Sequence, residues 1–139
     1  MLLDTSTPDR RRELAGVVGR WIDGCAESGY RAVESDNLDS FTRSRGLLTR
    51  ADALAVARLL AVRAHSAGLA IAQKNLASVS RTERLQIGFD FAGAEECEVW
   101  RECDRYARAY GQHVIETEYT DNGRRGTAPL VRELRNAGP

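Results

Sequence analysis

Acidic side chains that could catalyse hydrolysis occur in three short stretches of the sequence. The candidate carboxylates are Glu34, Asp36, Asp39, Glu95, Glu96, Glu116 and Glu118. Two carboxylates that face each other across a cleft can cleave a glycosidic bond, because one protonates the leaving oxygen while the other attacks or stabilises the sugar cation. Spacing along the chain does not choose among these candidates, so the fold must bring a pair together.

Lys74 is the only lysine of the chain, and it ends an apolar segment. A lysine in such a place could form a Schiff base, which would make the protein an aldolase-like lyase. Lysines at strand ends more often bind substrate or pair with acids, so we rank the lyase lower. The two histidines, His65 and His113, lie far apart, and no Cys–His spacing of a metal site is present. We therefore expect neither a metal nor an organic cofactor.

The elements that must position these side chains alternate between strand and helix. Strands are expected over 2–4, 30–36, 69–75, 87–92 and 113–119. Helices are expected over 9–28, 50–66, 97–110 and 127–136, with a weaker one over 78–85. Thr49 followed by Asp52 resembles a capping box at the start of the second helix. This alternation predicts a parallel α/β sheet with helical crossovers.

Polar side chains follow each expected strand. They are Asp4; Asp36 and Asn37; Lys74 and Asn75; Glu95, after a short turn; and Glu118 with Tyr119. The chemistry of parallel α/β proteins takes place at these strand ends. Solvent-facing loops would explain any one of the five, but five together favour a functional site.

The composition excludes several classes of function. The chain has 139 residues, about one small domain, with 20 basic and 20 acidic side chains. This balance argues against nucleic acid as a partner, and no apolar run approaches the ~20 residues of a membrane span. The N-terminus has no basic segment followed by an apolar one, so we expect no signal peptide in this chain.

Several segments in a fixed order carry a family resemblance that runs from Leu2 to about Thr120. They are 33–42 (VESDNLDSFT) with Gly46 and Leu48-Thr49; 64–69 (AHSAGL) before Lys74-Asn75; 89–91 (FDF) before Glu95-Glu96-Cys97; and Cys103 with Glu118-Tyr119-Thr120. Together they resemble glycoside hydrolase family 114, the endo-α-1,4-polygalactosaminidases. Enzymes of that family are (β/α)8 TIM barrels that cut α-1,4-linked galactosamine polymers.

The resemblance implies a role for individual residues. It makes Asp36 and Glu95 the catalytic acids and suggests a disulfide between Cys97 and Cys103, for which two buried thiols are the alternative. The residues implied to line the sugar subsites are Asn37, Asp39, Lys74, Asn75, Glu118 and Tyr119. It also implies a polysaccharide substrate and an extracellular or cell-surface location.

The chain departs from the family pattern near the expected acids. Ser35 replaces a proline, Ala94 an asparagine and Glu96 a glutamine, and Asp-Ser-Phe over 39–41 replaces Asp-Gly-Tyr. Two of these changes flank Glu95, so its hydrogen bonding and pKa are left open.

Length is the larger departure, since a (β/α)8 barrel takes about 250 residues. We expect 1–139 to form a single partial TIM-barrel domain of about five β/α units, the C-terminal part of the barrel, with N-terminal units missing. Its exposed barrel edges could self-associate. The alternative to a glycosidase is a non-catalytic remnant that binds carbohydrate or a partner chain.

Overall fold

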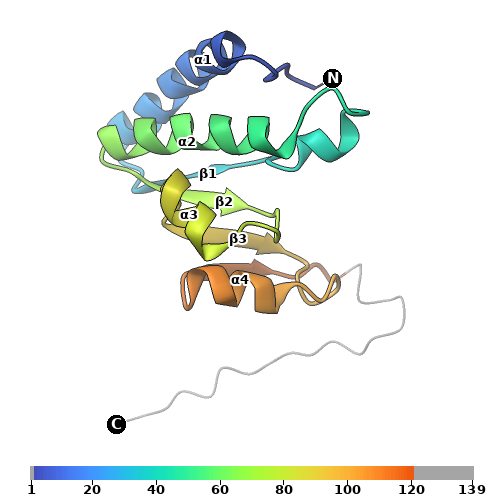
Figure 1. The fold of residues 1–139 in the computed structure, drawn as a ribbon. Helices are drawn as coiled ribbons and strands as arrows, with labels where there is room; N and C mark the ends of the chain where they lie inside the picture. Colours follow the sequence, from blue (N-terminus) through green and yellow to red (C-terminus); the bar gives the residue numbers. More distant parts are fainter. Residues whose placement is uncertain (1, 121–139) are drawn as a thin grey trace.

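In the computed structural model, residues 2–120 are described, and they alternate helices with strands (Figure 1). The helices are α1 (Pro8–Glu27), α2 (Arg50–Ser66), α3 (Arg81–Ile87) and α4 (Cys103–Tyr110), with a short 3-10 helix, η1 (Ser40–Arg43). The strands are β1 (Ala32–Ser35), β2 (Ala70–Lys74), β3 (Phe91–Glu95) and β4 (Val114–Thr117).

Side-chain caps fix where the helices begin. At α2, the Thr49 hydroxyl accepts from the Asp52 N–H at 3.1 Å, and the Asp52 carboxylate accepts from the Thr49 N–H at 2.9 Å. Ser80 and Glu83 form the same reciprocal capping box at α3. Such caps satisfy N–H groups that a helix start leaves without partners, at about 1 kcal/mol each. They fix the residue at which each helix begins after the preceding strand.

The strands form one parallel sheet in the order β1-β2-β3-β4 within residues 2–120. On one face, Ile71 of β2 joins Ala57 and Leu60 of α2 in the core. Gln73 lies on the same face, where the Tyr110 hydroxyl of α4 donates to its side-chain oxygen at 2.6 Å. Side chains alternate across a strand, so Lys74 belongs to the opposite face. We call that opposite face the inner face, because helices pack against the other one.

Several predicted elements differ from the structure. Leu2–Asp4 is not a strand, because β1 pairs only with β2 in the described residues, and the Asp4 carboxylate instead forms a turn before α1. The strand predicted over 87–92 is displaced to Phe91–Glu95, because Gly88, at φ 97°, ends α3 in the left-handed conformation.

The last two predicted helices have different outcomes. The helix predicted over 97–110 begins only at Cys103, because residues 97–102 form turns closed by the Glu102 N–H on the Cys97 carbonyl at 2.8 Å. The helix predicted over 127–136 lies outside the described residues. The remaining predicted elements correspond to elements of the structure, and α2 has the predicted bounds.

The α3 capping box predicts a specific loss of stability in acid. The guanidinium of Arg50 donates to the Glu83 carboxylate at 2.5 Å, and this bond, with those from Ser80, lowers the pKa of Glu83 from 4.5 to about 2. We expect Glu83→Gln to reduce the free energy of unfolding by about 1 kcal/mol at pH 7. Because the folded-state pKa is depressed, the difference from wild type should shrink as pH falls from 4.5 to about 2.

Urea unfolding at several pH values measures this difference. The exposed Glu13→Gln, on α1, is the matched control and should have little effect at any pH. A deficit in Glu83→Gln that stays constant down to pH 2 would rule out ionised Glu83 as its source.

Candidate functional site

Three carboxylates surround one ammonium where β1, β2 and β3 end. The Lys74 ammonium lies 3.4 Å from the Glu95 carboxylate and 3.8 Å from those of Asp36 and Glu34. Each strand contributes to the cluster because parallel pairing places all carboxyl ends at one edge of the sheet. The Lys74 side chain is only 22% exposed, so water screens these charges incompletely.

Both carboxylate oxygens of Glu95 accept hydrogen bonds from residues that follow other strands. The Tyr119 hydroxyl donates to one carboxylate oxygen at 2.6 Å, and the Asn75 side-chain amide donates to the other at 3.2 Å. These two bonds, aided by the charge of Lys74, lower the pKa of Glu95 against the opposing effect of burial. The site therefore favours an ionised Glu95 in the free protein.

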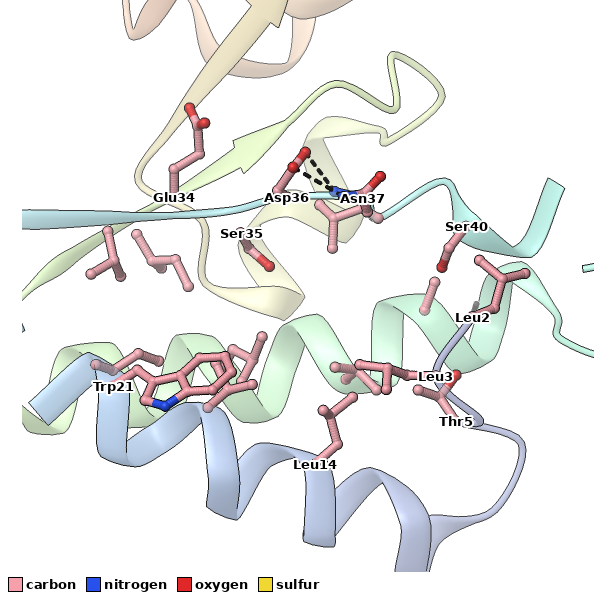
Figure 2. Close-up of a pocket in the computed structure, with 18 of the residues that line it drawn as sticks. Leu2, Leu3, Thr5, Leu14, Trp21, Glu34, Ser35, Asp36, Asn37 and Ser40 are labelled. Atoms are coloured by element: carbon pink, nitrogen blue, oxygen red, sulfur yellow. Dashed lines mark hydrogen bonds between the residues drawn. The ribbon is translucent and has the colours of Figure 1, made fainter. Parts of the chain in front are cut away.

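Asp36 is the more exposed partner. Its carboxylate accepts from the backbone N–H and the side-chain amide of Asn37, at 2.7 and 3.0 Å, and its side chain is 56% exposed. Figure 2 shows Asp36 and Glu34 on the side of β1 away from α1, whereas Ser35 points toward α1. Asp36 thus lies on the inner face, accessible to a ligand.

The shared contact with Lys74 sets an upper limit on the separation of the two acids expected to be catalytic. Both Asp36 and Glu95 contact the Lys74 nitrogen, at 3.8 and 3.4 Å, so the oxygens involved cannot be farther apart than those two distances combined. This bound admits the separation of about 5–5.5 Å in retaining enzymes and also the shortest inverting separations, from about 6.5 Å. The geometry is compatible with either stereochemical outcome.

A residue in the left-handed conformation turns the chain within two residues of the end of three strands. Asn37, Asn75 and Glu96 follow β1, β2 and β3 with φ of 57°, 53° and 56°. Asparagine tolerates this conformation better than most residues, whereas glutamate pays the full steric cost of about 1 kcal/mol. These turns leave the preceding side chains as the last ones on the inner face.

Other residues expected at the site lie around the carboxylate cluster rather than within it. The Arg43 guanidinium donates to Asp39 at 2.9 Å and to the Asn37 side-chain oxygen at 3.1 Å, which ties η1 to the end of β1. Glu118 accepts from the Glu98 N–H at 3.1 Å, so it contacts the loop after β3 rather than Lys74. Neither contact places its carboxylate in the central cluster.

A disulfide closes the loop that follows Glu95. Cys97 and Cys103 are bonded, with their Cα atoms 4.8 Å apart. Glu118 lies close enough to form a three-ligand group with the two sulfurs. Because both sulfurs are in the disulfide, the thiolates that a zinc site would require are absent.

Glu34 is a site residue that belongs to the candidate carboxylates of the sequence but to which the family resemblance gives no role. It precedes Asp36 by two positions, and side chains two apart on a strand share a face. That alternation was the signal that could have identified it as a neighbour of Asp36.

The three acids also raise the pKa of Lys74 in spite of its burial, which favours the ammonium over the neutral amine that a Schiff-base lyase needs.

An apolar groove of about 530 Å³ lies on the other side of β1, between that strand, α1 and α2 (Figure 2). Its lining includes Leu14, Leu60 and Ile71, with the exposed Trp21 on α1. Asp36 and Glu34 also border the groove, but their side chains point to the inner face. The groove is therefore separate from the carboxylate cluster.

The chain is similar to a known protein family and to a solved structure. The model of glycoside-hydrolase family GH114 matches residues 1–137. The crystal structure of Aspergillus fumigatus Ega3 in complex with galactosamine matches with a TM-score of 0.69 and 27% sequence identity, over 84% of this chain and 45% of that one. This chain thus spans less than half the length of that protein. No curated protein matches it.

The structural match confirms the predicted fold class. The parallel sheet and alternating helices of residues 2–120 correspond to part of a TIM barrel, with β1 to β4 as an arc of its wall. The inner face of the sheet is then the face toward the barrel axis, and the carboxylate cluster lies at the end of the barrel where TIM-barrel active sites occur.

The hydrogen bonds of Glu95 lead to a test of its ionisation. We expect Tyr119→Phe to raise the pKa of Glu95, because the phenol is the largest influence that lowers it. A carbon-13 titration of the Glu95 carboxylate measures this directly. Tyr30→Phe, at an exposed tyrosine before β1, is the matched control and should leave the titration unchanged. An unaltered pKa in Tyr119→Phe would show that this hydrogen bond does not set the ionisation of Glu95.

Proposed function

The chain belongs to glycoside hydrolase family GH114, and from that premise we propose that it cleaves α-1,4-linked galactosamine polymers with Asp36 and Glu95. One observation carries this proposal: the two carboxylates, at the C-terminal ends of β1 and β3, meet at the same lysine on the inner face. The reaction needs one acid to protonate the leaving oxygen and the other to act on the sugar or on water.

The charge of the site supports an amino sugar as substrate. Three carboxylates against the single Lys74 ammonium leave a local excess of negative charge. A deacetylated galactosamine unit carries a cation that this excess would attract. The Ega3 structure was obtained with galactosamine, and we propose the same class of sugar here.

The remaining residues of the proposed site fall into two groups. Asn75 and Tyr119 hold the Glu95 carboxylate, and a sugar hydroxyl could replace either as its partner. Asn37 and Asp39 follow β1, and Glu118 follows β4, at the C-terminal ends of the strands where TIM-barrel active sites occur. We propose all five, with Lys74, as substrate-contacting residues.

We further propose that these residues are one part of a single (β/α)8 domain. In the described residues, β1 and β4 each pair on one side only, whereas a closed barrel has no unpaired edges. Additional β/α units or a second chain would have to cover these edges, and self-association is one route. No helix within residues 2–120 has the length and apolar character to cross a membrane. An extracellular or cell-surface location is proposed from the family.

Loss of either acid should abolish turnover. We expect Glu95→Gln and Asp36→Asn each to lower the rate of reducing-end release from an α-1,4-galactosamine polymer by at least about 100-fold. Glu116→Gln, at an exposed carboxylate of β4 with no assigned role, is the matched control and should keep wild-type activity.

Polymer binding measured alongside separates the two candidate functions. For a hydrolase, Glu95→Gln still binds the polymer but releases no reducing ends. A wild-type chain that binds the polymer and releases none would support the non-catalytic carbohydrate-binding alternative. Full activity in both acid variants would refute the assignment of these residues.

A further inference from the structure

Gly93 has an unusual neighbour for a residue in the middle of a strand. It lies in β3 opposite Lys74 of β2. A Cβ atom built on Gly93 would overlap one carboxylate oxygen of Glu34 and would lie 3.4 Å from its Cδ. Glu34 belongs to β1, so its side chain reaches over β2 and occupies the space that a side chain at Gly93 would fill.

In this position the Glu34 carboxylate also lies close to the Lys74 ammonium. While one of its carboxylate oxygens lies over Gly93, the other is 3.8 Å from the Lys74 ammonium. Lys74 is thereby flanked by Glu34 of β1, by Asp36 just after that strand, and by Glu95 of β3. No one of these three pairs is as short as a normal charged hydrogen bond, which suits a cation shared among them.

We propose that Gly93 is a positioning residue of this site, which acts by leaving room for Glu34 to hold Lys74 between Asp36 and Glu95. The lysine stem is flexible, and its head group stays central only while carboxylates attract it from several sides. Without Glu34 in place, the ammonium would pair more closely with Asp36 or Glu95. It would then occupy the carboxylates that the proposed hydrolysis requires.

The chain offers a substitution that tests this without disrupting the fold. Gly93 does not have a positive φ, so an alanine there introduces no backbone strain. The overlapping atom is the end of a flexible side chain, and the nearest backbone atom, the Gln73 carbonyl oxygen, is 4.0 Å away. Gly93→Ala should therefore fold normally and displace Glu34.

The first measurement uses the fact that the chain has a single lysine. The rate at which an amine-specific acylating reagent modifies Lys74 at pH 8.5, followed by peptide mass spectrometry, reports the fraction of neutral amine and its accessibility. We expect Gly93→Ala and Glu34→Gln each to increase this rate about three- to tenfold, which is the effect of moving one neighbouring negative charge away or removing it. Gly24→Ala, in open space on α1, is the control and should leave the rate unchanged.

The double variant Gly93→Ala/Glu34→Gln distinguishes positioning from independent effects. If Gly93 acts through Glu34, Lys74 of the double variant is modified at the same rate as Lys74 of Glu34→Gln alone. Additive increases, or a wild-type rate in Gly93→Ala with an unchanged melting temperature, would overturn the proposal. This measurement needs no substrate, so it holds even if the wild-type chain proves inactive and only the proposed function fails.

Kinetics provide the second readout, and this part rests on the proposed function. With an active wild type, Gly93→Ala should lower kcat about tenfold, with a smaller change in KM, because the displaced Lys74 ammonium pairs with the two acids that the reaction needs. Glu34→Asp, whose side chain is one methylene shorter, should restore part of kcat in the Gly93→Ala background. A loss that appears only in KM, or a failure of this rescue, would contradict a positioning role.

Discussion

The parallel register of the four strands is the constraint on which the site depends. Lys74 pairs with Gly93, and Glu95 pairs with Thr117, so the polar side chains lie together at the C-terminal end of the strands. Side chains alternate across each strand, and a slip of one residue would exchange the two faces. Lys74 would then enter the core and Gln73 would replace it on the inner face. The packing that fixes the register therefore also fixes the positions of the charged side chains on the inner face.

Buried polar contacts connect the core to the cluster. Gln73 is 1% exposed, and its side-chain oxygen accepts from Tyr110 of α4. Its amide donates to the backbone carbonyls of Asn75 and Leu76, at 2.6 and 2.9 Å, which holds the left-handed turn after β2. Asn75 in turn contacts both the backbone and the carboxylate of Glu95. Since leaving one buried polar group without a partner costs about 1–3 kcal/mol, this sequence of bonds gives the site a rigid support.

Local signals in the sequence were enough to predict most of the elements, whereas contacts between strands could not be predicted from them. The Thr49 cap predicted α2 with its observed bounds, and the equivalent signal at Ser80, three residues before Glu83, would have placed α3 and with it β3. The proximity of Asp36 and Glu95 could be expected from parallel strand ends. The contact of Glu34 with Gly93 could not, because it spans two strands and depends on the register between them.

The disulfide at the rim has a consequence for how the protein must be made. Cys97 and Cys103 close the loop that begins two residues after Glu95, and Cys25 is a third, unpaired thiol packed against the core. Disulfides persist in oxidising compartments and are reduced in the cytosol. Protein expressed in a reducing cytosol would carry an open loop beside the acid, and air oxidation during purification could then join Cys25 to the wrong partner. Export to an oxidising compartment avoids such mixed isomers.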